Sequence, residues 1–269
     1  MKNIERNRAM IMPVIDAHIH FDQYKKKEQM RILDELETYQ VKSLISVSCV
    51  FDSAQKNLAL SRMDPRVKPA FGYHPEQPLP DEEELQNLLR FIEQYNEEMI
   101  AVGEIGLPYY LKKKDSTIQT DAYIDVLEEF IKAAVQWNKP VVLHAIYDDA
   151  PVVIDLLEKY SIKRAHFHWF KGDKRTLQHM AENGYFISFT PDLVYEEEIQ
   201  TIVRNYPLSQ LMAETDGPWP FEGPFQGQMT HPKMIHESIR VLAKLKKKDL
   251  KEVYQSLQQN TEQFYSIDG

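Results

Sequence analysis

The sequence contains few features that would place the chain in a specialised class. Cys49 is the only cysteine among 269 residues, so no intrachain disulfide can form, and a reducing compartment fits. No apolar run reaches the ~20 residues that cross a bilayer. The first ten residues, MKNIERNRAM, are polar and match neither a signal peptide nor a lipidation motif. We therefore expect a soluble cytoplasmic protein with residues 1–12 as an N-terminal extension.

An excess of positive charge is also missing. The net charge is −9 and the sequence pI is about 5.5. A protein that holds duplex nucleic acid by electrostatics alone is normally basic, so a general nucleic-acid scaffold is disfavoured. An enzyme is not excluded, because metal ions or a small basic rim can hold a polyanionic substrate locally.

A glycine-rich phosphate-binding motif is missing after the first strand, which disfavours a doubly wound open sheet. Instead, short β-type runs alternate with amphipathic helical patterns, for example at 81–96, 120–137 and 248–265. The predicted strands span residues 13–20, 42–49, 67–73, 99–105, 140–145, 164–169, 184–189 and 210–215. Eight strand–helix pairs in about 250 residues are typical of a (β/α)₈ TIM barrel of the α/β class. We interpret residues 1–269 as one such domain.

The stretch VIDAHIHFD, residues 14–22, puts two imidazoles and a carboxylate into an apolar strand. Strand alternation would place Asp16, His18 and His20 on one face together with Val14. Burying these groups is costly unless something satisfies them. A hydrogen-bond network and a metal ion both do so, and these nine residues alone do not decide between them.

Further polar residues stand where later strands end, the position of catalytic groups in TIM-barrel enzymes. Alternation makes Glu104, His144 and Asp216 the last inward-facing residues of strands four, five and eight. The complete set of strand-end candidates is His18, His20, His74, Glu104, His144, His166, His168 and Asp216. Imidazoles mixed with carboxylates suit zinc, manganese or another borderline divalent metal. Four histidines and two carboxylates are enough for two ions, with Glu104 able to bridge them.

The motifs DAHIHFD, GEIGLPYY, VVLHA, FHWFKG and ETDGP, in order from about residue 14 to 260, resemble those of the TatD family of metal-dependent hydrolases, a branch of the amidohydrolase-type barrels. The resemblance implies two divalent ions per chain (zinc, manganese, magnesium or nickel), one held by His18, His20 and Asp216, the other by His144 and His168, with Glu104 bridging both. It also implies deoxyribonuclease activity, in some members a 3′ to 5′ exonuclease. The expected partner is then single-stranded or frayed DNA, or a small phosphoester.

Two metals in this arrangement favour hydrolysis by a metal-bridging hydroxide, because bound ions depress the pKa of water to roughly 7. Glu104 and Asp216 are the predicted catalytic residues, and Asp216 is the best candidate to accept the proton of the water. Two other interpretations stay open. The same metal pair could hydrolyse a small ester, lactone or amide, or the barrel could bind metal or a partner without turnover.

The chain departs from the family pattern beside the predicted ligands. Pro108 stands where the family commonly has aspartate, and Ala145, Ile146 and Tyr147 replace a frequent Ser-Arg-Asp. These departures leave the ligand set intact but put the substrate in doubt. Gly217, next to Asp216, is expected to leave room for substrate.

Several neighbouring residues have a functional and a structural interpretation. Asp16 and Glu214 are expected to orient imidazoles from the layer below, His74 either touches substrate or belongs to a loop, and His166 is expected to be packed. Lys25–Lys27 and Lys112–Lys114 form either a basic rim or solvated helix faces. Trp169 and Trp219 either stack on a base or pack the barrel top. Structural roles are expected for the remainder: Cys49 packed in strand two, and His179, His231 and His236 at the surface.

Overall fold

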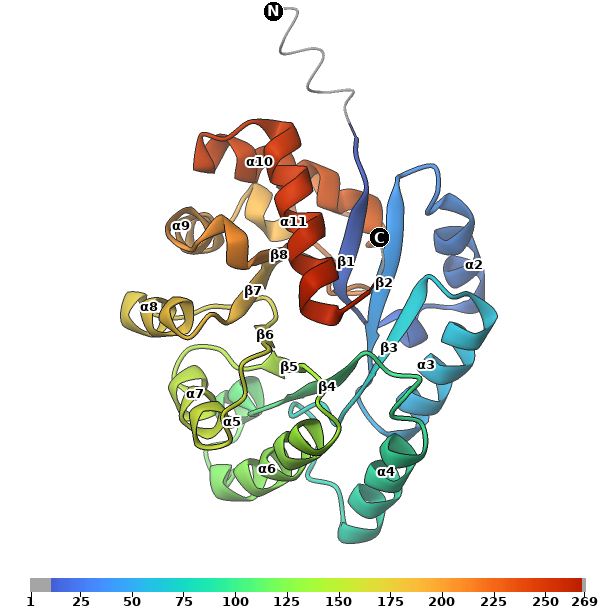
Figure 1. The fold of residues 1–269 in the computed structure, drawn as a ribbon, viewed down its shortest axis with the longest axis vertical. Coiled ribbons are helices and arrows are strands. Elements are labelled where there is room, and N and C mark those ends of the chain that lie inside the picture. The colour runs from blue at the N-terminus through green and yellow to red at the C-terminus, as the bar shows by residue number, and fades with distance from the viewer. Residues whose placement is uncertain (1–10, 268–269) are drawn as a thin grey trace, which may run out of the picture.

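The computed structural model describes residues 11–267, so the predicted extension is covered only at 11 and 12 and its first ten residues lie outside the described part. Eight parallel strands form one sheet in the order β1-β2-β3-β4-β5-β6-β7-β8. Their bounds are Val14–Ile19, Val41–Val47, Val67–Phe71, Ala101–Gly106, Val141–His144, Ala165–Phe167, Phe186–Phe189 and Leu211–Ala213. Each strand overlaps its predicted range, which confirms the TIM barrel (Figure 1).

Ten α-helices in the described residues surround the sheet (Figure 1). They are α2 (Lys26–Glu35), α3 (Phe51–Met63), α4 (Glu82–Gln94), α5 (Tyr109–Lys114), α6 (Thr120–Gln136), α7 (Asp149–Lys159), α8 (Lys174–Glu182), α9 (Glu197–Asn205), α10 (Ile235–Lys246) and α11 (Leu250–Tyr265). Local sequence sets several helix starts: Asp81, Asp173 and Asp249 are N-caps whose carboxylates accept backbone N–H groups of the first turn. Within residues 11–267, no helix combines the length and apolar character needed to cross a membrane.

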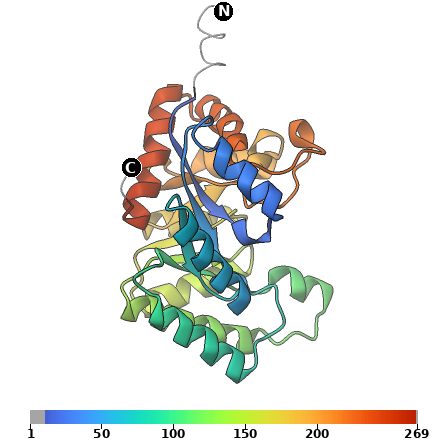
Figure 2. The same ribbon diagram turned by 90° about the vertical axis from the view of Figure 1, so that its right-hand side faces the viewer.

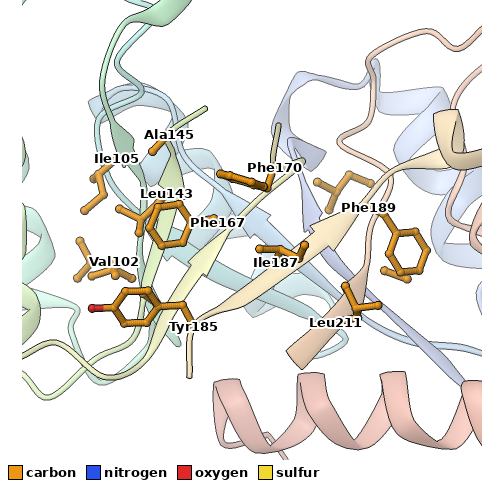
Figure 3. Close-up of a cluster of buried hydrophobic side chains, with 14 of the residues drawn as sticks. Val102, Ile105, Leu143, Ala145, Phe167, Phe170, Tyr185, Ile187, Phe189 and Leu211 are labelled. Carbon is orange, nitrogen blue, oxygen red and sulfur yellow. The ribbon is translucent and has the colours of Figure 1, made fainter. Parts of the chain in front are cut away.

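Two apolar layers hold the barrel together. The larger one lies between strands and helices; Figure 3 shows part of it, where Val102, Leu143 and Phe167 pack with residues of β7 and β8. The smaller layer fills the barrel interior and joins strand side chains such as Ala17 and Met212 to the aromatic end of α11. Because α11 lies across the end of the barrel beside β1 and β8 (Figure 1), it closes the face opposite the strand ends.

The strict alternation expected along β1 and β4 is interrupted. In β1 the pairing register with β2 shifts between Val14 and Ile15 and again between Asp16 and Ile19. In β4 the register with β5 shifts between Val102 and Ile105. As a result Val14 and Val102 belong to the helix-facing layer. For Val14 this contradicts the prediction that it shares a face with His18. Both irregularities lie in strands that carry predicted metal ligands.

The strand ends converge on one side of the barrel. Two backbone hydrogen bonds join the chain after β8 to β1 and the residue that follows it. Asp216 N donates to His18 O (2.9 Å), and His20 N donates to Gly217 O (2.8 Å), so the first and last strands of the barrel are connected at their carboxyl ends. Helix α5, which follows β4, and the loop before α10, which follows β8, project on the same side (Figure 2). This is the face on which the sequence places the candidate site.

Candidate metal centre

Glu104 lies at the centre of the strand ends and is fully buried. Its Oε2 is 3.3 Å from Nε2 of His18 and 3.3 Å from Nε2 of His20. The same two imidazole nitrogens lie 3.3 and 3.4 Å from Oδ1 of Asp216. Contacts of this length are the ligand–ligand separations expected around a tetrahedral ion with bonds of ~2.0–2.1 Å. These four side chains therefore form one set with the spacing of a metal site.

The other oxygen of Glu104 faces a second set. Its Oε1 is 2.8 Å from Nε2 of His168 and 3.0 Å from Nδ1 of His144, and these two nitrogens are 3.3 Å apart. Nε2 of His74 also approaches Oε1, at 3.3 Å. All six predicted ligands are thus brought together, in the two groups that the family resemblance implies, and His74 joins them at the edge of the second group.

The centre carries polar atoms that the protein leaves unsatisfied. Nε2 of His18, Oε2 of Glu104 and Oδ1 of Asp216 are buried and have no hydrogen-bond partner among the described residues. Buried polar atoms are normally paired, so such a cluster requires an explanation. A divalent cation between them supplies it, and the donor set of imidazoles and carboxylates fits one.

The electrostatics indicate the same demand for positive charge. Burial alone would raise the pKa of Glu104, but the imidazoles of His74, His168 and His18 bring it well below its usual range. Burial would lower the pKa of His168, whereas Glu104 and Glu214 raise it well above its usual value. The carboxylates therefore stay ionised only with cationic neighbours, a role that metal ions fill in such clusters.

The backbone is bent sharply where two of the strands deliver their groups. Asp216 has φ of 48° and Trp169 has φ of 37°, in the left-handed region that residues with side chains rarely adopt. The turn after Asp216 is also tight. A Cβ on Gly217 would lie 1.8 Å from the hydroxyl of Tyr24, which fills this space. The expectation that Gly217 leaves room for substrate is therefore wrong: the room is needed for Tyr24.

The predicted supporting residues differ in what they touch. Glu214 accepts a hydrogen bond from Trp169 N (2.8 Å) and lies 3.6 Å from Nδ1 of His168, a position that suits orienting this imidazole. Asp16 instead accepts hydrogen bonds from Thr215 N (2.9 Å) and Thr215 Oγ1 (2.5 Å). The direct role of Asp16 is thus to hold the chain after β8 against β1, not to orient an imidazole as predicted.

Four further histidines lie away from the two ligand sets. His166 is packed as predicted, hydrogen-bonded to Ser188 Oγ (2.6 Å) in the barrel interior. His179 is exposed, also as predicted. The surface prediction is wrong for His231 and His236, which are 1% and 3% exposed. His231 lies against α2, and His236, itself on α10, packs against α11 and the turn after α2. Their burial comes from helix packing that no local pattern reveals.

The rim of the site mixes lysines and aromatic rings. Lys25–Lys27 lie exposed at the start of α2, whereas Lys112 pairs with the buried Asp149. Lys113 lies over the ring of Tyr109 at 4.8 Å. Trp219 is 56% exposed and stands edge-on to the half-buried Trp169. The rim therefore offers stacking surfaces together with limited positive charge.

Two residues near the centre were placed wrongly or missed by the sequence prediction. Cys49 lies past the end of β2 and not within it, with Sγ 3.4 Å from Nδ1 of His20. Glu76, two residues after His74, was not among the candidates, yet its Oε1 is 3.3 Å from Nε2 of His144. Its one sequence signal is its position two residues after a strand-end histidine.

The comparisons with known proteins agree with this geometry. The model of the TatD related DNase family matches residues 15–266. An uncharacterized metal-dependent hydrolase of Haemophilus influenzae is 35% identical over 255 residues, covering 94% of this chain and 100% of the relative. The human protein named deoxyribonuclease TATDN3 is 28% identical over 94% of each chain. The crystal structure of YjjV, a TatD homolog from Escherichia coli, superposes with a TM-score of 0.85 at 25% identity, covering 95% and 98% of the two chains. The chain belongs to the TatD related DNase family of metal-dependent hydrolases.

Proposed function

We propose that this hydrolase is a two-metal phosphodiesterase of the deoxyribonuclease type. The observation that carries the proposal is that the two oxygens of Glu104 face different histidines. Oε2 faces His18 and His20, whereas Oε1 faces His168 and His144. A buried carboxylate with a separate imidazole pair at each oxygen is the arrangement expected of a bridging ligand in a site for two ions. The name of the human relative supports the choice of a DNA phosphodiester.

The residues fall into two ligand sets in this proposal. His18, His20 and Asp216 would hold one ion, His144 and His168 would hold the other, and Glu104 would contribute one oxygen to each set. When bound, two divalent ions supply an activated water and neutralise the charge that develops on the phosphate oxygens. Zinc, manganese, magnesium and nickel remain candidates, since imidazoles and carboxylates together accept all of them.

Asp216 is the proposed proton acceptor. Its side chain is 10% exposed, so it reaches the open face of the site while Oδ1 faces the imidazoles. A carboxylate at this position can take a proton from the attacking water and return it to the leaving oxygen. Glu214, through its contacts with Trp169 N and His168, holds the His168 side of the site in place.

The rim supports a strand end as substrate. Trp219, exposed beside Asp216, offers a face on which a base can stack, and Lys25–Lys27 can approach its phosphates. Because the net charge is −9, duplex binding over a long surface is disfavoured, which favours single-stranded or frayed DNA.

A substrate panel tests the proposal. The metal-reconstituted protein is assayed on single-stranded DNA, duplex DNA, RNA, a chromogenic phosphodiester and a lactone, each with Mg²⁺, Mn²⁺, Zn²⁺ and Ni²⁺. The expected result is metal-dependent cleavage of single-stranded DNA that is lost in Glu104→Gln and kept in Glu93→Gln, which makes the same change on the exposed side of α4. Turnover of the lactone with no cleavage of any phosphodiester would overturn the nuclease assignment in favour of a small-molecule hydrolase.

A further inference from the structure

Helix α5 starts without a capping side chain of its own. Its N-cap is Pro108, which accepts no side-chain hydrogen bond, although the first N–H groups of a helix need acceptors. Aspartate is among the best residues for this position, whereas proline has no side-chain acceptor. The N–H groups of Tyr110 and Leu111 must therefore be satisfied from elsewhere.

Glu76 satisfies them from the loop after β3. Its Oε1 accepts from Tyr110 N and its Oε2 from Leu111 N, each at 2.7 Å. These are the second and third N–H groups of the helix, the pair that an N-cap aspartate would serve. The side chain is 14% exposed, so the charge is held in a largely enclosed position.

The same carboxylate reaches the metal centre. Oε1 of Glu76 lies 3.3 Å from Nε2 of His144, while Nδ1 of that ring faces Glu104 and His168. One group therefore touches the outer nitrogen of a predicted ligand and the start of the neighbouring helix. Tyr110, whose ring centroid lies 6.1 Å from that of His144 and which is 41% exposed, is carried by this helix at the mouth of the site.

We propose that Glu76 is a positioning residue that supplies the helix cap which Pro108 cannot provide and also fixes His144 at the metal centre. This rests on the proposed function in one respect, because His144 is taken there as a ligand of the second ion. A carboxylate on the outer nitrogen of a metal-binding histidine fixes the tautomer and the ring orientation. Because the same carboxylate also accepts from the first turn of α5, Glu76 couples the start of this helix to His144.

The two roles of Glu76, capping α5 and contacting His144, can be separated by placing a capping aspartate at residue 108 and removing the Glu76 carboxylate. We would compare Glu76→Ala, Glu76→Gln, Pro108→Asp and the double variant Glu76→Ala/Pro108→Asp, with Glu93→Ala as a control on exposed α4. Two measurements need no substrate: hydrogen exchange of the amides of 109–114, and stepwise affinities for Zn²⁺ and Mn²⁺ by chelator competition. Glu76→Gln retains one carbonyl oxygen and guards against a folding defect in Glu76→Ala.

Glu76→Ala should lose protection in 109–114 and bind the second ion about 10–100-fold more weakly, with the first ion little changed. Glu76→Gln should fall between Glu76→Ala and the native protein. In the double variant, protection should return while the second affinity stays low. Full recovery of that affinity in the double variant would overturn the positioning role and leave a helix cap only, and unchanged behaviour of Glu76→Ala in both measurements would overturn the proposal altogether. A native protein that binds no second ion contradicts the proposed function and also the proposed role of Glu76 in positioning His144. The hydrogen-exchange data on 109–114 then still test whether Glu76 caps α5.

Discussion

At the scale of single residues, Asp216 combines a structural and a chemical position. Its Oδ1 contacts His18 and His20, yet the side chain remains partly open to the rim. Asp216→Asn keeps the shape but cannot take a proton, so kcat should fall by about 10²–10⁴-fold, the usual effect of losing a general base. The ion on His144 and His168 should stay bound. Turnover and metal content measured on one preparation check this; near-native turnover in fully metallated Asp216→Asn would remove Asp216 from the mechanism.

Single residues also show where sequence reasoning works. His144 and His168 are predictable because each stands at the end of a short predicted strand, at the level where TIM-barrel enzymes carry their catalytic groups. Glu76 follows a strand by several residues and acts on backbone groups of another segment, so no periodicity points to it. Asp16 was recognised as buried, but its partner Thr215 lies 199 residues away, and only the closed barrel brings them together.

At the scale of elements, His231 joins the turn before α10 to α2. Its Nδ1 accepts from Lys233 N at 3.1 Å, and its Nε2 lies 3.4 Å from Oε2 of Glu35. Burial, helped by the charge of Lys233, lowers the pKa of His231 from 6.5 to about 4. The folded state therefore favours the neutral ring. The stability it contributes is complete above about pH 6.5 and is lost as the pH falls toward 4.

Replacing His231 should make the free energy of unfolding fall less steeply as the pH is lowered below 7. Between pH 7 and pH 5 the free energy of unfolding of the native protein should drop by about 2 kcal/mol more than that of His231→Gln. Urea unfolding in the presence of chelator, at both pH values, measures the difference. Parallel pH dependences for the two proteins would show that His231 is not held neutral by the fold.

The elements themselves were largely predictable. Strands such as 140–145 are short apolar runs between turn residues, and helices such as 120–137 repeat apolar residues at helical spacing, so their existence follows from local pattern. The register shifts in β1 and β4 were not predictable, because they arise from pairing with β2 and β5. Those shifts decide which residues face inward beside Glu104.

At the scale of the whole molecule, three of the predicted ligands lie at the seam of the barrel: His18 in β1, His20 directly after it, and Asp216 after β8. Closure of the barrel therefore also assembles this part of the site. Asp16 accepts from Thr215 at this seam. Asp16→Ala leaves a buried N–H unsatisfied and should cost about 1–3 kcal/mol, whereas Asp16→Asn keeps an acceptor and should cost less. Urea unfolding compares the two. An Asp16→Ala protein as stable as the native one would show that the seam does not depend on this carboxylate.

The central claim is that Glu104 serves two ions at once, and metal stoichiometry with stepwise affinity tests it most directly. The native protein, stripped and then reconstituted with Zn²⁺ or Mn²⁺, should hold two ions per chain roughly 3.5–4 Å apart. Glu104→Gln removes the shared charge and should weaken both binding steps together, while Glu93→Gln on exposed α4 should weaken neither. A native protein that never exceeds one ion per chain, or a Glu104→Gln protein that keeps one site at native affinity, would contradict the account.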